Sequence, residues 1–389
     1  MKALCWMGVN ELSVENVQDP GLLNDGDAIV RVSRSAVCGS DLHLIDGYIP
    51  AMRQGDVLGH EFIGEVVETG PSVQNLTEGD RVVVCSIISC GRCRYCQSGQ
   101  FSLCDNGNAE PAGFEALFGY AGAGIFGYSH LLGGYAGSHA EYIRVPFADV
   151  GCFKVPEGLS DDAAVFASDG VPTGWMAADF CEIEPGAVVA VWGAGGVGQM
   201  AAKSAQLLGA ERVMVIDRYP ERLRMVEDQL GLETLNYSEV SVSEALREIT
   251  AGRGPDACIE AVGMESHGFG PQYAYDSLKQ SLRLESDRPV ALRQAIYACA
   301  KGGVVSVVGV FGGFIDKFPM GAVVNKGLTL KSAQQHGHRY IPMLLERMAA
   351  GEIPTEHLLT HPMSLTQGAE AYDLFKNKKD GCVRAVLTP

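Results

Sequence analysis

Residues 192–198 read Trp-Gly-Ala-Gly-Gly-Val-Gly and decide how the second half of the chain folds. An apolar run at 187–192 precedes them, and an amphipathic helical pattern follows. In this G-x-G-x-x-G order Gly193 permits a tight turn, Gly195 lets the backbone approach a pyrophosphate, and Gly198 lets the helix pack on the strand. The stretch therefore predicts a dinucleotide cradle in which helix amide groups face the phosphates.

The cradle extends to Asp217, which ends the next apolar run. A carboxylate there can accept hydrogen bonds from both ribose hydroxyls and would repel a 2′-phosphate, so it favours NAD. Arg218 and Arg222 follow it and leave room for mixed cofactor use, and the alternative for Asp217 is an ordinary turn acid. Gly196 and Val197 complete the predicted cofactor-binding turn.

Strands alternate with helices throughout this half, which implies a parallel, doubly wound sheet. Its candidate strands are 187–192, 213–216, 257–262, 304–308 and 328–330. The first half is β-rich instead, with candidate strands at 28–36, 62–67, 81–84 and 140–145 separated by Gly, Asp and Asn. Two segments, 106–137 and 263–293, fit neither pattern. We interpret both as long inserted loops that could cover a binding cleft.

Composition narrows the class of protein. The chain has 389 residues, enough for two domains, and 47% of them are hydrophobic, as in a folded globular protein. A net charge of −17 argues against nucleic acid and anionic membranes as partners. No signal peptide and no long apolar run is evident, so we expect a cytoplasmic protein. In a reducing compartment its 12 cysteines indicate metal binding, catalysis or burial rather than disulfides.

Four of these cysteines, Cys90, Cys93, Cys96 and Cys104, lie in one short stretch. Two-residue gaps let successive thiolates turn inward around one ion, and zinc takes four such donors at tetrahedral corners. Four thiolates leave no open position, so this ion would hold the lobe together and perform no chemistry. An iron–sulfur cluster or four buried thiols are the alternatives.

A second group consists of Cys38 and His60. Taken alone, the first is more often a buried small residue and the second a satisfied core histidine. Their combination, in a region where Cys and His are otherwise sparse, makes both candidate metal ligands.

With these motifs the chain resembles, nearly end to end, the zinc-dependent medium-chain alcohol dehydrogenases. Their catalytic zinc is held by a Cys, the His of a Gly-His-Glu segment, here 59–61, and a third residue downstream. In the matching stretch, 166–174, Asp169 occupies the third position, where that family often has Cys. A helix cap is the alternative for Asp169. A Cys, His and Asp set leaves a corner open to water or substrate, as catalytic zinc needs, and Glu61 could act as a second carboxylate.

This departure, the two insertions and the phrase at 262–268 resemble the glutathione-independent formaldehyde dehydrogenase and dismutase branch. The resemblance implies a GroES-like catalytic domain at 1–169, an NAD-binding Rossmann domain at 170–335 and a C-terminal return to the catalytic domain at 336–389. It also implies two zinc ions per chain and a homotetramer. Thr173 and Val197 would contact the nicotinamide, and the backbone of Val310 and Phe311 would bind its carboxamide.

The family's chemistry implies roles for two further side chains. Zinc would stabilise the alkoxide formed from the substrate, and hydride would leave for the nicotinamide. Ser40 would accept the substrate proton, and His43 would pass it to solvent. The alternatives are a turn hydroxyl for Ser40 and a solvated imidazole for His43. The substrate would be the hydrate of formaldehyde or another small aldehyde, and bound NADH could then reduce a second aldehyde.

Rival interpretations remain at this point. A polyol, threonine or general primary-alcohol dehydrogenase would share every motif, and a non-catalytic NAD-binding or redox-sensing protein would keep the fold without the chemistry. A zinc-free quinone reductase is disfavoured, because it needs neither the four thiols nor Cys38. We expect His267, His336 and His338 at the surface rather than beside the pocket.

Overall fold

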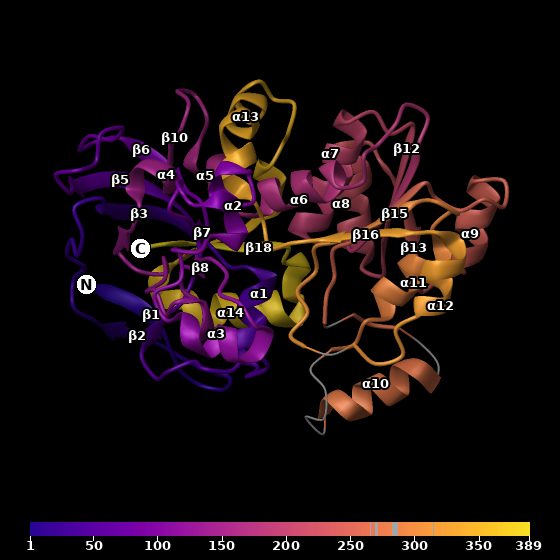
Figure 1. Ribbon diagram of the computed structural model, residues 1–389, viewed down its shortest axis with the longest axis horizontal. Coiled ribbons are helices and arrows are strands. Elements are labelled where there is room, and N and C mark those ends of the chain that lie inside the picture. Colours follow the sequence, from indigo (N-terminus) through magenta and orange to yellow (C-terminus); the bar gives the residue numbers. More distant parts are fainter. Residues whose placement is uncertain (265, 269–270, 282–286, 314) are drawn as a thin grey trace. The chain divides into compact units, whose positions relative to one another are not determined.

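The computed structural model describes residues 1–264, 266–268, 271–281, 287–313 and 315–389. The chain divides into two compact units, Met1–Pro172 with Gln335–Pro389, and Thr173–Gln334. Helix α6 (Gly170–Asp179) carries the chain from the first unit into the second. Figure 1 labels the elements of both units.

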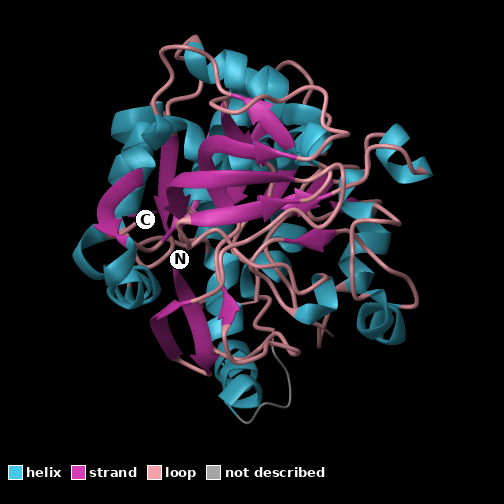
Figure 2. Ribbon diagram, turned by 90° about the vertical axis from the view of Figure 1, so that its left-hand side faces the viewer, coloured by secondary structure: helices cyan, strands magenta, loops and turns pink. Residues whose placement is uncertain are grey.

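The first unit is rich in β-strands, as predicted, and most of its strand pairs are antiparallel, whereas β17 and β18 are parallel. Its large sheet has the order β10-β6-β5-β3-β18-β17, with β9 paired to β3. Figure 2 draws the strands of the protein in magenta. A smaller sheet has the order β2-β1-β4, and β7 pairs with β8. The strands are β1 (Lys2–Gly8), β2 (Glu11–Asn16), β3 (Ala28–Ala36), β4 (Asp56–Val57), β5 (Glu61–Thr69), β6 (Arg81–Val84), β7 (Ile87–Ile88), β8 (Gly124–Ile125), β9 (Tyr142–Val145), β10 (Cys152–Lys154), β17 (Leu359–Ser364) and β18 (Arg384–Thr388).

The C-terminal segment belongs to this unit because β18 pairs antiparallel with β3, Val386 lying opposite Ala36. The helical elements of the unit are mostly short, apart from α13 and α14. They are α1 (Gly39–Ile45), α2 (Arg94–Gln97), η1 (Phe101–Leu103), α3 (Pro111–Phe118), η2 (His130–Leu132), α4 (Ala148–Gly151), α5 (Asp161–Ala164), η3 (Val165–Ser168), α13 (Gly337–Ala349), η4 (Glu356–Leu358), η5 (Leu365–Gln367), α14 (Gly368–Asn377) and η6 (Lys379–Gly381).

The second unit is a parallel sheet with the strand order β13-β12-β11-β14-β15-β16. This is the predicted doubly wound topology, in which the order reverses at β11 and ligands bind at the carboxyl ends of the strands. Its elements are β11 (Val188–Trp192), α7 (Gly196–Leu207), β12 (Arg212–Asp217), α8 (Pro220–Leu230), β13 (Glu233–Asn236), α9 (Val242–Ile249), β14 (Ala257–Glu260), α10 (Pro271–Ser281), α11 (Val290–Ala298), β15 (Val304–Val307), α12 (Met320–Lys326) and β16 (Thr329–Ser332).

Helices cover both faces of this sheet, because side chains alternate along each buried strand. In β11, Val189 and Val191 pack with residues of α6, α7 and α8. Ala190 and Trp192 point to the other face and pack with residues of α9, α11 and α12. The apolar run that precedes the glycine turn is therefore buried on both sides.

The interpretation of 106–137 and 263–293 as loops is wrong for part of each segment. The first contains α3, which begins at Pro111 and ends before Gly119 in the left-handed conformation. Proline at the start and glycine past the end are helix signals. However, α3 buries none of its residues, so the sequence shows no apolar periodicity that would predict a helix there. The second contains α10 and the start of α11. Residues 265, 269–270 and 282–286 of that segment lie outside the described residues.

Candidate metal centres and cofactor cradle

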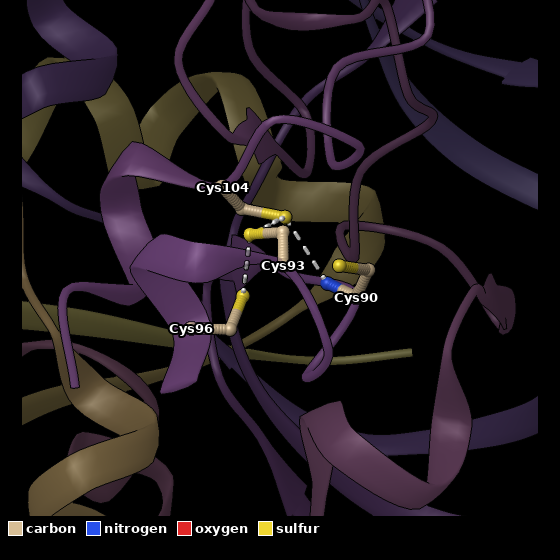
Figure 3. A group of neighbouring side chains, drawn as sticks. All are labelled: Cys90, Cys93, Cys96 and Cys104. Carbon is tan, nitrogen blue, oxygen red and sulfur yellow. Dashed lines mark hydrogen bonds between the residues drawn. The ribbon is translucent and has the colours of Figure 1, made fainter. Parts of the chain in front are cut away.

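The four clustered cysteines form one compact group. They come from the turn after β7, from α2 and from the end of η1, and their sulfur atoms all lie within 4.8 Å of one another (Figure 3). Three of them are buried, and Cys93 is partly exposed. Among the described residues, no acidic or imidazole side chain belongs to this group, so its donor set is four thiols.

Nitrogen donors surround these sulfur atoms. The backbone N–H of Cys90 donates to Sγ of Cys104 at 3.2 Å, and that of Asn106 donates to the same sulfur at 3.4 Å. The Asn106 amide donates to Sγ of Cys90 at 3.2 Å. Burial opposes ionisation of Cys90, but the hydrogen bonds from Asn106 and from the backbone prevail and lower its pKa to about 6. Burial raises the pKa of Cys96 and Cys104 instead. The feature that fits zinc is therefore the set of four converging sulfur donors.

A second, mixed group lies where α1 and β5 begin. Cys38 is the residue before α1, His60 is the residue before β5, and Glu61 is its first residue. Their ligand atoms lie within 4.8 Å of one another, and all three side chains are buried. Burying a thiol, an imidazole and a carboxylate together is costly unless a cation compensates. This donor set therefore also fits a divalent metal ion.

Charged partners hold two members of this group. Oδ1 of Asp41 lies 3.1 Å from Nδ1 of His60, while its Oδ2 accepts the Cys38 amide at 2.9 Å. Burial raises the pKa of Asp41, but the attraction of His60 outweighs it and the net shift is downward. Nη2 of Arg384 lies 3.0 Å from Oε1 of Glu61. Burial nevertheless raises the Glu61 pKa, and Arg384 offsets only part of this effect.

Asp169 lies beside this group but outside its most compact part. Its Oδ2 is 3.9 Å from Nε2 of His60 and accepts a hydrogen bond from Ser86 Oγ at 2.6 Å. Gln335 donates in turn to Ser86 Oγ at 2.6 Å. The carboxylate of Asp169 is partly exposed, whereas that of Glu61 is fully buried. Two carboxylates thus compete for the third ligand position.

The two side chains expected to relay protons are placed differently. Ser40 Oγ lies 3.3 Å from Sγ of Cys38 and 3.3 Å from Nε2 of His60, so it borders the group directly. His43 lies on the same helix and is buried, which excludes the solvated imidazole considered from the sequence.

In the second unit the glycines adopt the geometry that the cradle requires. Gly193 has a φ of 102°, in the region that favours glycine. A Cβ on Gly198 would lie 1.8 Å from the Gly193 carbonyl oxygen, so only glycine fits there. Asp217 ends β12 and is buried; its Oδ2 accepts the Ala194 amide at 2.8 Å and its Oδ1 that of Arg218 at 2.6 Å. The acid and the glycine turn therefore form one hydrogen-bonded unit.

Most of the remaining cofactor candidates lie near this turn or follow a strand at its carboxyl end. Gly196 and Val197 open α7, and the Arg218 and Arg222 side chains pack on the Tyr219 ring. Val310 and Phe311 follow β15, where the Val310 carbonyl accepts the Met264 amide at 2.8 Å. Thr173 is buried in α6.

Comparison with known proteins agrees with this construction. Residues 24–157 match the alcohol dehydrogenase GroES-like domain family, and residues 196–274 match the zinc-binding dehydrogenase family. An uncharacterized zinc-type alcohol dehydrogenase-like protein of Bacillus subtilis, AdhB, is 36% identical over the whole of both chains. The chain belongs to the zinc-type medium-chain alcohol dehydrogenases. Its cofactors are accordingly zinc and a nicotinamide dinucleotide.

Two further relatives refine the comparison. Alcohol dehydrogenase TADH from Thermus sp. ATN1 superimposes with a TM-score of 0.82 at 34% identity and covers 100% of this chain and 99% of its own. The formaldehyde dismutase of Pseudomonas putida is 35% identical, over 70% of this chain and 67% of its own length. The family is shown by full-length relatives, whereas the similarity to the formaldehyde enzyme is partial.

Within this zinc-type dehydrogenase, several residues at the site have no motif of their own. Asp41, Ser86, Gln335 and Arg384 reach the mixed group from distant parts of the sequence. A place for Asp41 near the site could have been predicted from the sequence, because Asp41 lies in the helical turn that follows Cys38. The same could not be predicted for Arg384, since only the pairing of β18 with β3 brings it near Glu61.

The expectation of surface positions for His336 and His338 is wrong. Both are buried, because α13 packs against η1. His338 stacks on Phe101, with ring centroids 4.6 Å apart, and His336 Nδ1 lies 3.1 Å from Ser102 Oγ. His267 is partly buried, with Nδ1 3.1 Å from the Tyr273 hydroxyl. Among the described residues, no helix is long and apolar enough to cross a bilayer.

Proposed function

We propose that this zinc-type dehydrogenase transfers hydride between NAD and a small alcohol or aldehyde hydrate, with formaldehyde as the representative substrate. The observation that carries the proposal is the buried group of Cys38, His60 and Glu61, with Asp169 beside it. A zinc ion bound by Cys38, His60 and one of the two carboxylates would supply Lewis-acid activation of the substrate oxygen.

The chain's own residues would move the proton. The Ser40 hydroxyl lies 3.3 Å from Nε2 of His60 and is positioned to accept a proton from the substrate oxygen. His43 is buried three residues further along α1 and would pass that proton on. His43 is buried and Ser40 is partly buried, which limits the access of bulk water and strengthens electrostatic interactions at the site.

NAD is favoured over NADP because Asp217 is buried at the end of β12 with its carboxylate tied to the glycine turn. An adenosine 2′-phosphate would meet this fixed negative charge. The guanidinium groups of Arg218 and Arg222 pack on the Tyr219 ring nearby. Their positive charges would attract a 2′-phosphate and so weaken the preference for NAD.

A formaldehyde-like substrate is supported by Asp169 in place of a third cysteine, and by the partial similarity to the dismutase of Pseudomonas putida. In a dismutation, two formaldehyde molecules and one water give one formic acid and one methanol. NAD would be reduced in the first half-reaction and reoxidised in the second. This scheme needs a cofactor that stays bound between the two.

Steady-state kinetics test the proposal. We expect the highest kcat/KM for formaldehyde among formaldehyde, ethanol and longer aldehydes, with no requirement for glutathione and with NAD preferred to NADP. A preference for polyols or secondary alcohols would contradict the substrate. Equal yields of formate and methanol without added NAD would support dismutation, and an absolute requirement for free NAD would reject it.

The family resemblance also leads us to propose a homotetramer in the cytoplasm. Light scattering on the purified protein tests the assembly, with a mass of four chains as the expected result. Fractionation of the source cells tests the location.

A further inference from the structure

Behind the mixed group, on the side away from Ser40, a continuous row of buried polar side chains crosses the first unit. The hydroxyl of Tyr372 in α14 lies 3.0 Å from Nε2 of His139 and interacts with the carboxylate of Asp41. Nδ1 of His139 lies 2.7 Å from Ser35 Oγ, which lies 2.7 Å from Ser138 Oγ. All of these side chains are buried, and none has a role in the function proposed above.

The chemistry of these groups fixes the direction of every hydrogen bond in the row. Asp41 accepts the Cys38 amide through Oδ2 at 2.9 Å and faces Nδ1 of His60 with Oδ1, and as a carboxylate it can only accept. The Tyr372 hydroxyl must therefore donate to Asp41 and accept from Nε2–H of His139. Burial keeps His139 neutral, with a pKa of about 4, so its Nδ1 carries no proton and accepts from Ser35.

The same logic continues toward the metal. The Asp41 oxygen that lies 3.1 Å from Nδ1 of His60 can only accept, so it favours a proton on Nδ1. A neutral imidazole that carries its proton on Nδ1 has a lone pair on Nε2. In His60, Nε2 is the ring nitrogen that faces Ser40 and Asp169. The row thus selects the one tautomer of His60 that can bind an ion at this site.

His139 also fixes His60 through the backbone. Gly59, the residue before His60, has a φ of 95°. A Cβ at Gly59 would lie 2.5 Å from Nδ1 and 2.7 Å from Cγ of His139, so the ring occupies the space where a side chain would be. The His139 imidazole therefore packs against the backbone just before His60. Through Tyr372 and Asp41 it also orients the His60 side chain.

We propose that His139 and Tyr372 are positioning residues for the catalytic zinc: they hold Asp41, and through it His60, in the orientation and tautomer that bind the ion. This inference rests on the proposed function only in taking Cys38 and His60 as zinc ligands. Groups that orient a ligating imidazole typically change metal affinity 10- to 100-fold when removed.

Tyr372→Phe tests the proposal, because it removes one hydroxyl and keeps the ring. We expect zinc to leave the mixed site to a chelator at least about 10-fold faster. The visible absorption of a cobalt-substituted mixed site should also shift. The four-thiol site in the same molecule is an internal reference and should release its metal at the wild-type rate.

The matched control is Tyr135→Phe, which removes a hydroxyl that donates to the Gly107 carbonyl at 3.0 Å in the same unit. It should lose similar stability and keep wild-type zinc release from the mixed site. His139→Phe is a second variant in the same row, so the conclusion does not depend on Tyr372→Phe folding correctly. Since both residues act through one row, the double variant should lose less zinc affinity than the two single effects added together.

The outcomes separate this inference from the proposed function. If the wild-type protein holds two zinc ions, and Tyr372→Phe matches Tyr135→Phe in release rate and cobalt spectrum, the positioning role is overturned and the proposed function stands. If the wild-type protein holds only the four-thiol zinc, both are overturned. Purely additive effects of the two variants would also overturn a shared row.

Discussion

The two metal centres of the first unit are built in opposite ways. The four-thiol group comes from one stretch, 90–104, and its sulfur atoms accept hydrogen bonds from the backbone of Cys90 and from Asn106, just beyond that stretch. The mixed group collects Cys38, His60 and Glu61, and it depends on Arg384 from the other end of the chain. A local, closed set of thiols suits a structural ion, whereas a dispersed set with an excess of carboxylates suits an ion that must leave room for substrate.

This difference indicates that the four-thiol centre should contribute to stability and the mixed centre to activity. Filling all four positions with thiolates makes zinc binding part of the folding free energy of the lobe. The mixed group already has its neighbours fixed by sheet pairing and by ion pairs, so the fold should survive loss of its ion. Substitutions in the two centres should therefore separate stability from activity.

The largest effect is expected for Cys38→Ser. Removing the one thiolate of the mixed group should lower kcat/KM on the order of 10³-fold or more, since metal activation supplies several kcal/mol of transition-state stabilisation. Metal analysis should find one zinc per chain in place of two, and the thermal unfolding midpoint should stay close to that of the wild-type protein. Full activity with one zinc would assign catalysis to other residues.

The next effect concerns stability. Cys96→Ser should destabilise the protein by several kcal/mol, because the lobe loses the ion that holds it. Chemical denaturation measures this loss, and the protein that remains folded should keep most of its kcat. Cys5→Ser is the matched control, since Cys5 is also buried but belongs to neither metal group. Equal losses in the two variants would show that the lobe needs no ion.

The contrast between the centres also explains what the sequence could predict. The four-thiol group follows from spacing alone, and the glycine turn with Asp217 follows from strand and helix periodicity, because all of these signals are local. The fold class was confirmed for the same reason. Helix α3 escaped prediction because it buries no residue.

The mixed group was only partly predictable, since its geometry depends on pairing between distant strands. The family resemblance grouped Cys38, His60 and Asp169 and named Glu61 as a possible second carboxylate. The structure places the ligand atoms of Cys38, His60 and Glu61 within 4.8 Å of one another. No local pattern could show that Arg384 would meet Glu61, or that Ser86 and Gln335 would support Asp169. The assignment of the third ligand therefore stays a prediction.

Two variants settle that assignment. Asp169→Asn should weaken zinc binding at the mixed site 10- to 100-fold, because its partly exposed carboxylate borders the open side. Glu61→Gln should mainly reduce stability, by about 3 to 5 kcal/mol, since it leaves the buried Arg384 guanidinium without its counter-charge. Zinc titration and denaturant unfolding measure the two effects. If Glu61→Gln loses zinc and Asp169→Asn keeps it, Glu61 is the third ligand.

The smallest expected effect returns to the four-thiol group and asks whether its surroundings matter as those of His60 do. Asn106→Ala removes the side-chain donor to Sγ of Cys90 while the backbone donor to Cys104 remains. One such hydrogen bond is worth about 1 kcal/mol, so zinc should leave the lobe roughly fivefold faster with kcat unchanged. Chelator competition measures the release, and exposed Asn75→Ala is the control. If both variants release zinc at the wild-type rate, the backbone amides alone support the thiolates, and the closed centre needs no side-chain partner of the kind that Asp41 provides to the open one.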